Sequence, residues 1–454
     1  MTIIEEDSRT KIDHTDPKTS AIEVRGREFE SQDVDEKIYG MEGYQPQFLN
    51  LTGLDLEPAQ RISQASVPPG IGLANFGKNI MTFEASSTSV LDFWVVVGDS
   101  PQDILSRYAD ATGHSPMMPD YGLGFWQSKL PYLNQNEFME TAREYKKREL
   151  PIDIMLVDYF HWPFQGDWKW DQTCWPDSAG MIQELRSMGI QLVVSVWPTV
   201  DKRSENYSEM VKRGLLIRVE HGLHTTRDFM GQNVQADFTN PSTRVKSFWL
   251  DETEPEYNNY AFEDYRYYLG PAMSVTNVYP LSYVKAMYDG QVAAGQPVEC
   301  PDGILNLARC SWASSQKNQI ASGLNMGMAG IPWWTTDIVG FYGGVNEDPA
   351  FRELLVRSFQ FGSFCPVMRL YSCREPIRIA PVDEGGASHC PSGNDNELWS
   401  FGEDNYRILR KFVKMSYRIR DYLRDLMQEA RDRCSPVIRT LFFEFPDDSL
   451  SWEV

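Results

Sequence analysis

Four carboxylates follow one short apolar segment near the middle of the chain. The run FWLDETEPEY places Asp251, Glu252, Glu254 and Glu256 after Phe-Trp-Leu. An acid at the end of a buried strand is partly desolvated, which suits nucleophilic or acid–base chemistry. A solvated acidic turn would contain the same residues, and clustered carboxylates also suit Mg²⁺. The metal interpretation is the weaker one, because the other predicted strand ends lack partner acids in the pattern of a metal-binding barrel.

Polar and aromatic residues follow the other apolar segments as well. In a parallel barrel, the C-terminal ends of the strands form one rim, and catalytic groups lie there. Carboxylates, arginine and aromatic rings at one rim suit a neutral polyhydroxy ligand with a cationic transition state. Plainer roles are a strand-end cap for Asp158, a core position for Trp162 and a structural ion pair for Arg309. The candidates at this rim are Asp158, Phe160, His161, Trp162, Trp197, Arg309, Asp337, Arg369 and Tyr371.

Other kinds of site are disfavoured by the motifs that the sequence lacks. The six histidines form no metal-spaced cluster, so zinc is not expected. There is no GxSxG run, which argues against a serine hydrolase. No glycine-rich phosphate-binding run follows a predicted strand, which disfavours a dinucleotide-binding fold. We therefore expect neither a metal nor a cofactor.

Strand-like and helix-like segments alternate beyond the first quarter of the chain, and this alternation predicts a parallel sheet. The number of units favours a (β/α)8 barrel over an open doubly wound sheet. One helix is predicted over 137–150, with Phe138, Ala142 and Tyr145 on one face, and another is capped by Asp177. The predicted strands are 122–126, 152–160, 190–197, 246–252, 304–309, 329–334 and 365–370.

One strand-like run conflicts with this arrangement. Only TNPSTRV separates QADF (235–238) from the strand that precedes Asp251. A parallel crossover needs about a dozen residues or more. Either the two strands are not neighbours in the sheet, or a helix between them is missing.

The two ends of the chain differ from its middle. Residues 1–115 contain short alternating runs such as SVLDFWVVV (89–97), which predict a β-rich accessory domain. Residues 405–436 form a long charged segment that we predict to be a helix. An apolar run, LFFEF, follows it close to the end of the sequence.

The composition indicates a globular protein without affinity for polyanions. The chain has 454 residues, a net charge of −21 and a pI near 4.8, so nucleic acid and anionic membranes are not expected partners. Aromatic residues make up 13% and suit a sugar-binding cleft, although most of the 13 Trp would fill a core. Scattered cysteines, no apolar leader and no run of membrane-spanning length indicate a cytoplasmic protein. The sequence does not indicate an oligomeric state.

Ten segments resemble glycoside hydrolase family 31, which contains α-glucosidases and α-xylosidases. Their order matches the family and several are long, so the resemblance is specific. It implies a partly deleted β-sandwich-like, galactose-mutarotase-like domain over 1–115, a (β/α)8 catalytic barrel over 116–430 and a truncated β domain that begins over 431–454. The segments are DEKIYGMEGYQ, YGLGFWQSK, LPIDIMLVDYFHWP, GIQLVVSVWPTVDKRSENY, ADFTNP, FWLDETEPEY, ARCSWASSQ, GLNMGMAGIPWWTTDIVGF, FCPVMRL and SPVIRTLFFEFPDD.

The resemblance also implies roles for the residues at the rim. The mechanism would be retaining, with Asp251 as the nucleophile that forms a glycosyl-enzyme ester. Asp158 and Arg309 would bind sugar hydroxyls. The DYFHW run is more similar to α-xylosidases, because bulky groups there crowd the space that a C6 hydroxymethyl group needs. The implied substrate-binding aromatic residues are Trp126, Phe160, Trp162 and Trp197 as walls, with Tyr371 in place of the family's histidine.

The sequence also departs from the family. SWASSQK passes directly into NQIASGLNMG, so the strand that carries the family's acid/base aspartate is absent. The helix between ADFTNP and FWLDE is absent too, which would explain the short crossover. Val339 replaces a glycine. Asp337 is a weak candidate for a substitute acid.

The resemblance therefore predicts a retaining α-glycosidase for terminal α-linked xylose or glucose, impaired by the loss of its acid. Loss of general acid catalysis alone would cost on the order of 10²–10⁴-fold in rate. Two alternatives remain, a catalytically inactive sugar-binding paralogue and a faulty gene model whose product does not fold. A carbohydrate is the expected partner of the enzyme and of the paralogue.

Overall fold

The structure is a computed structural model, and it describes the chain in separate stretches. Three of the predicted site residues, Asp251, Phe160 and Arg309, lie outside the described residues. Residues 89–94 of the predicted strand 89–97 also lie outside the described residues. The described residues are 2–4, 28–30, 37–40, 49–51, 72–74, 80–84, 95–159, 161–219, 233–241, 249–250, 265–298, 304–308, 316–378 and 392–452.

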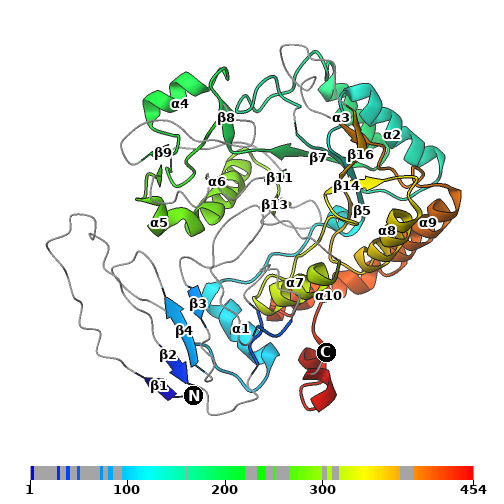
Figure 1. Cartoon of the computed structure of the whole chain (residues 1–454). Coiled ribbons are helices and arrows are strands. Elements are labelled where there is room, and N and C mark those ends of the chain that lie inside the picture. The colour runs from blue at the N-terminus through cyan, green and yellow to red at the C-terminus, as the bar shows by residue number, and fades with distance from the viewer. Residues whose placement is uncertain are drawn as a thin grey trace.

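Six parallel strands form the central sheet (Figure 1). Their order follows the chain, except that the last strand, β15, pairs with the first, β5. A parallel sheet whose first and last strands are neighbours curves into a barrel. This arrangement confirms the predicted α/β class. Across the sheet the strands are β13 (Leu307–Ala308), β11 (Trp249–Leu250), β7 (Gln191–Val196), β6 (Ile154–Val157), β5 (Phe125–Lys129) and β15 (Met368–Leu370).

Amphipathic helices cover the outer face of this sheet (Figure 1). Phe138 and Tyr145 are fully buried against the strands, as the predicted apolar face requires. The side chain of Asp177 accepts a hydrogen bond from the backbone of Gly180, so the predicted cap is confirmed. The outer helices are α2 (Gln135–Lys147), α3 (Ser178–Ser187), α8 (Pro349–Gly362) and α9 (Glu403–Arg418).

A second apolar cluster packs beside β7 and β11. The Tyr283 hydroxyl donates to the carbonyl of Val196 at 3.0 Å, which attaches helix α6 to the end of β7. Gln235, the first residue of the QADF run, pairs with Thr199 in the antiparallel pair of β10 and β8. Among the described residues β10 is not a neighbour of β11, which resolves the conflict over the short connection. The elements here are β8 (Thr199–Asp201), α4 (Tyr207–Arg213), β9 (Arg218–Val219), β10 (Asn233–Gln235), β12 (Tyr265–Arg266), α5 (Ala272–Val275), η3 (Thr276–Val278) and α6 (Tyr279–Ala293).

A four-stranded antiparallel sheet lies near the N-terminus, in the order β1-β2-β4-β3. Figure 1 shows it beside α1 and away from the barrel helices. Its strands are β1 (Thr2–Ile4), β2 (Glu28–Glu30), β3 (Gly72–Ala74) and β4 (Ile80–Glu84), and α1 spans Pro101–Thr112.

The remaining elements either precede β5 or follow β13 along the chain. The ring of Tyr39 packs on Phe442 at 4.5 Å, and Phe442 stacks on Trp452 at 4.3 Å, so a segment from near the N-terminus contacts the C-terminal region. None of the helices in the described ranges is long and apolar enough to cross a lipid bilayer. These elements are η1 (Asp120–Leu123), α7 (Gln316–Met328), β14 (Tyr342–Val345), β16 (Cys373–Arg378), β17 (Ser392–Asn394), α10 (Arg420–Arg433), α11 (Leu441–Glu444) and η5 (Ser449–Trp452).

Several sequence predictions need correction. The AGIPWW segment, 329–334, is not a strand, although the chain that follows it lies along β15 through a bond from Ile338 N to Arg369 O at 3.4 Å. The single helix predicted over 405–436 is two helices, because the helical conformation is interrupted at Ile419. The part of 431–454 that the structure describes contains helical turns and no strand, and the β domain expected to begin there stays a prediction.

Candidate active site

The rim of the barrel brings two predicted site residues into direct contact. Ile154 and Leu156 of β6 point into the barrel, and the alternation of a strand directs Asp158 the same way. Asp158 is fully buried, and its carboxylate Oδ2 accepts a hydrogen bond from the Tyr371 hydroxyl. Tyr371 directly follows β15, so this contact joins two strands that lie on either side of β5. Two of the predicted rim residues, Asp158 and Tyr371, are therefore in direct contact.

The ring of Tyr371 has two further partners at the rim. It stacks on Phe341, with ring centroids 5.3 Å apart and an angle of 29° between the planes. The guanidinium carbon of Arg369 lies 5.4 Å from the centroid of Tyr371, within cation–π range. Sequence analysis did not single out Phe341, which belongs to the GF dipeptide at the end of the TDIVGF run.

Asp337 lies at the same rim and forms an ion pair with Arg369. The side chains are 15% and 7% exposed, so water screens this pair much less than an ion pair on the surface. The Oδ1 atom of Asp337 accepts a hydrogen bond from the guanidinium of Arg369. Within the described part of the chain this carboxylate therefore binds an arginine, and its role as a substitute acid stays a prediction.

Three aromatic rings form a compact cluster beside Asp158. Trp162 and Trp197, both predicted walls, pack with Tyr159 and are 1% and 6% exposed. The ring of Tyr159 lies 4.4 Å from that of Trp197 and 6.4 Å from that of Trp162. Tyr159 has a φ of +47°, which is uncommon for a residue with a side chain and lets the chain turn sharply after Asp158. The sequence analysis missed Tyr159, although it lies inside the DYFHW run.

Trp126, the fourth predicted wall, lies elsewhere in the barrel. It is 1% exposed and packs with Ile154 and Val367 in the barrel interior. Its indole N–H donates to the carbonyl of Gly122 at 3.0 Å. Trp126 is in register with Ile154, at the N-terminal end of β6, whereas Asp158 follows the C-terminal end. Its part in substrate binding stays a prediction.

The structure describes the residue that precedes the predicted nucleophile, Asp251, but not Asp251 itself. Asp251 is the next residue after Leu250, and Leu250 pairs in register with Val196 on one side and Ala308 on the other. Arg309 is the next residue after Ala308. Both predictions thus follow directly on neighbouring strands at the rim, while their side chains lie outside the described residues.

His161 is buried between two indole rings at this rim. Its ring lies 4.5 Å from that of Trp162 and 4.9 Å from that of Trp170. Burial lowers the pKa of His161 to about 3, and its Nδ1 has no hydrogen-bond partner in the described part of the chain. The histidine is therefore neutral in the folded protein at physiological pH.

Lowering the pH from 7 to 5 is expected to destabilise the fold by about 2 kcal/mol through His161. The unfolded chain takes up this proton near pH 6.5, whereas the folded chain does so only near pH 3, so acid favours the unfolded state. The contribution of His161 to the stability of the fold is complete above pH 6.5 and is lost as the pH falls toward 3. Urea unfolding at both pH values measures the change. His161→Gln should lose this part of the pH dependence, and an unchanged slope in that variant would contradict the assignment.

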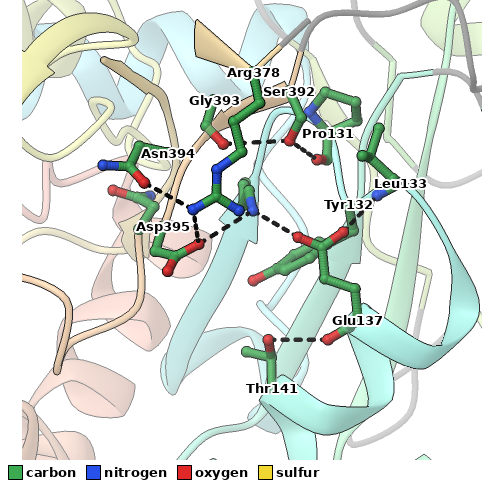
Figure 2. A network of polar contacts seen from close by, with 12 residues as sticks. Pro131, Tyr132, Leu133, Glu137, Thr141, Arg378, Ser392, Gly393, Asn394 and Asp395 are labelled. Carbon is green, nitrogen blue, oxygen red and sulfur yellow. Dashed lines mark hydrogen bonds and ion pairs between the residues drawn. The ribbon is translucent and has the colours of Figure 1, made fainter. Parts of the chain in front are cut away.

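A network of charges braces the end of β5, outside the barrel. Lys129 is 1% exposed and donates to Glu137 Oε1 at 2.6 Å, and its Nζ lies 3.6 Å from Asp395 Oδ1. Figure 2 shows Arg378 reaching the same carboxylate of Asp395, at 3.1 Å. The neighbouring Ser392 hydroxyl donates to the carbonyl of Pro131 at 2.8 Å (Figure 2). These contacts hold β16 and β17, which follow Tyr371, against the end of β5.

Replacing Lys129 with methionine should lower the free energy of unfolding by about 1–3 kcal/mol, because Glu137 loses the hydrogen bond from a charged donor that is 1% exposed. Arg378→Met is the matched control, since Arg378 binds the same carboxylate from a side chain that is 54% exposed. Such exposed pairs contribute at most about 1 kcal/mol. Urea unfolding of both variants measures the difference, and equal losses would show that burial does not set the strength of this network.

Comparisons with known proteins agree with the barrel and extend the resemblance. Residues 115–426 match the family model of the "Glycosyl hydrolases family 31 TIM-barrel domain". The chain is 43% identical over 421 residues to an "Uncharacterized family 31 glucosidase ORF2" of Pseudescherichia vulneris, covering 80% of this chain and 79% of that protein. It is 26% identical over 443 residues to an α-xylosidase of Saccharolobus solfataricus, covering 88% of this chain and 57% of that protein.

A solved structure gives the same result. The crystal structure of a GH31 α-xylosidase from a soil metagenome, complexed with xylose, superposes with a TM-score of 0.88 at 45% identity. The match covers 96% of this chain and 70% of that one. The predicted TIM-barrel fold is thereby confirmed.

Proposed function

The chain belongs to glycosyl hydrolase family 31, and on this basis we propose that it acts as a retaining α-glycosidase on terminal α-linked xylose. The observation that carries the proposal is the contact between Asp158 and Tyr371 beside a cluster of buried indole rings, at the C-terminal rim of the barrel. Catalytic groups of such barrels lie at this rim. A buried carboxylate beside flat rings can bind sugar hydroxyls and sugar C–H faces together.

In the proposed mechanism, a carboxylate oxygen of Asp251 attacks the anomeric carbon. The bond from that carbon to the leaving oxygen breaks, and a glycosyl ester of Asp251 forms. Water then attacks the same carbon, the ester bond to Asp251 breaks, and the water loses a proton to solvent, so the sugar leaves with its original configuration. Asp158 and Arg309 would hold the sugar hydroxyls during both steps.

The leaving oxygen needs a proton in the first step, and the sequence lacks the family's segment that supplies it. We propose that the chain is therefore slow on substrates with poor leaving groups. An aryl leaving group with a low pKa departs without a proton, so aryl α-xylosides should still react.

Two kinds of support favour xylose over glucose. The solved α-xylosidase that holds xylose is 45% identical to this chain. The rings of Tyr159, Trp162 and Trp197 pack against one another beside Asp158, and bulky groups there would crowd a C6 hydroxymethyl group. Glucose is the second candidate, because the relative from Pseudescherichia vulneris is named a glucosidase and is 43% identical.

Hydrolysis of 2,4-dinitrophenyl α-xyloside and α-glucoside by the full chain tests the proposal. We expect the xyloside to have the larger kcat/KM. Incubation with 5-fluoro-α-xylosyl fluoride should add one fluoroxylosyl group, detectable by intact mass spectrometry. Calorimetric binding of xylose without an adduct would instead favour the sugar-binding paralogue. A broad, non-cooperative thermal transition would favour a chain that does not fold.

A further inference from the structure

The ion pair of Asp337 and Arg369 has no part in the proposed mechanism, yet it lies at the same rim. Arg369 is buried, at 6% exposure. Removing one partner of an ion pair that is buried this deeply strongly destabilises the fold. Its guanidinium contacts both the carboxylate of Asp337 and the ring of Tyr371. The pair is therefore connected to a side chain of the candidate site.

The backbone around Asp337 is held to the same strand that carries Arg369. Thr335 Oγ1 donates to Val367 O at 2.6 Å, and Ile338 N donates to Arg369 O at 3.4 Å. Val339 follows with a φ of +65°, a conformation that a β-branched residue adopts only when its surroundings impose it. Its N–H donates to Ser358 Oγ at 2.7 Å, which fixes this turn to helix α8.

The contacts continue from Arg369 to the proposed sugar-binding carboxylate. Arg369 and Phe341 both contact the ring of Tyr371, which restricts its orientation. The hydroxyl of the restrained ring donates to Oδ2 of Asp158, which is fully buried. Four side chains thus form one continuous path, in the order Asp337, Arg369, Tyr371 and Asp158.

We infer that Asp337 and Arg369 are positioning residues that act through Tyr371 to fix the carboxylate of Asp158 for sugar binding. The inference rests on the proposed function, because it requires that Asp158 binds the sugar. It assigns Asp337 a role different from that of a substitute acid. A positioning residue affects every substrate alike, whereas an acid matters most for poor leaving groups.

The test measures xylose affinity by calorimetry, and kcat and KM on two aryl α-xylosides with leaving groups of high and low pKa. Asp337→Asn, which preserves shape, is expected to weaken xylose binding about 10-fold, roughly the loss of one hydrogen bond. Tyr371→Phe should have a similar effect. The double variant should bind no more weakly than Tyr371→Phe alone, because both changes act on one path. Arg369→Lys should restore part of the affinity that Arg369→Met loses.

Glu184→Gln is the control, since it removes an exposed pair with Arg143 on the outer helices and should leave binding unchanged. Unchanged xylose affinity in Asp337→Asn, additive losses in the double variant, or a loss confined to the poorer leaving group would each overturn the inference and leave the proposed function standing. If the unmodified chain neither binds xylose or glucose nor cleaves their aryl glycosides, the proposed function fails and the inference fails with it.

Discussion

Replacing Asp251 with asparagine is expected to reduce hydrolysis of 2,4-dinitrophenyl α-xyloside on the order of 10⁴–10⁶-fold, as loss of a catalytic nucleophile does elsewhere. An amide cannot form the glycosyl ester on which a retaining mechanism depends. The activated leaving group is essential to this experiment, because it makes formation of the glycosyl ester insensitive to the missing acid. Initial rates and the yield of the 5-fluoroxylosyl adduct are the two measurements.

The acidic run around Asp251 supplies its own matched control. Glu254→Gln removes the same charge from the same run, three residues further along the chain. If the run is only a solvated acidic turn, the two variants should behave alike. The prediction fails if Asp251→Asn still forms the adduct, since another residue would then be the nucleophile.

Replacing Asp158 with asparagine is expected to lower kcat/KM for the same substrate on the order of 10²–10³-fold, the loss of one or two hydrogen bonds to a charged group. The substitution keeps the size of the side chain and removes its charge. Xylose affinity measured by calorimetry should fall together with kcat/KM, because the lost contacts are present before the transition state. Steady-state kinetics and calorimetry on one preparation therefore check the prediction.

Asp237→Asn is the control for burying a carboxylate without a role at the rim. Asp237 is 2% exposed, and it accepts bonds from the Thr239 and Tyr268 backbone at 3.0 and 2.6 Å. That variant should lose stability and keep its affinity for xylose. An Asp158→Asn protein that is less stable but binds xylose normally would show that Asp158 is structural too.

The sequence by itself determined the elements that alternate regularly and the residues that follow them. The helix of Phe138 and Tyr145 and the cap at Asp177 depend on local periodicity and local hydrogen bonds, so they can be predicted without knowledge of the fold. The apolar runs also sufficed to place Asp158 at a strand end, and the resemblance of ten segments to known sequences indicated the family. Such signals depend only on residues that are close in the sequence, so they can be recognised without the fold.

Elements whose stability depends on distant partners could not be predicted in the same way. The run before Asp337 is apolar like a strand, but it lies along β15 with only isolated hydrogen bonds. The break at Ile419 divides a segment whose periodicity looks continuous. The strand β10 pairs with β8, and no local pattern distinguishes that pairing from a place in the parallel sheet.

The connections among the site residues were decided by the tertiary structure alone. Lys129 and Glu137 are close in the sequence, whereas Asp395 comes from a distant part of the chain, and only the fold buries Lys129 between them. Arg369 lies in β15 and Tyr371 directly follows it, whereas their partners are Asp337, from a segment without regular secondary structure, and Asp158, which directly follows β6. Hydrogen bonds and ion pairs of this kind depend on which segments the barrel brings together and on how much water is excluded between them. The residue types were visible in the sequence, and the curvature of the barrel determined which of them meet.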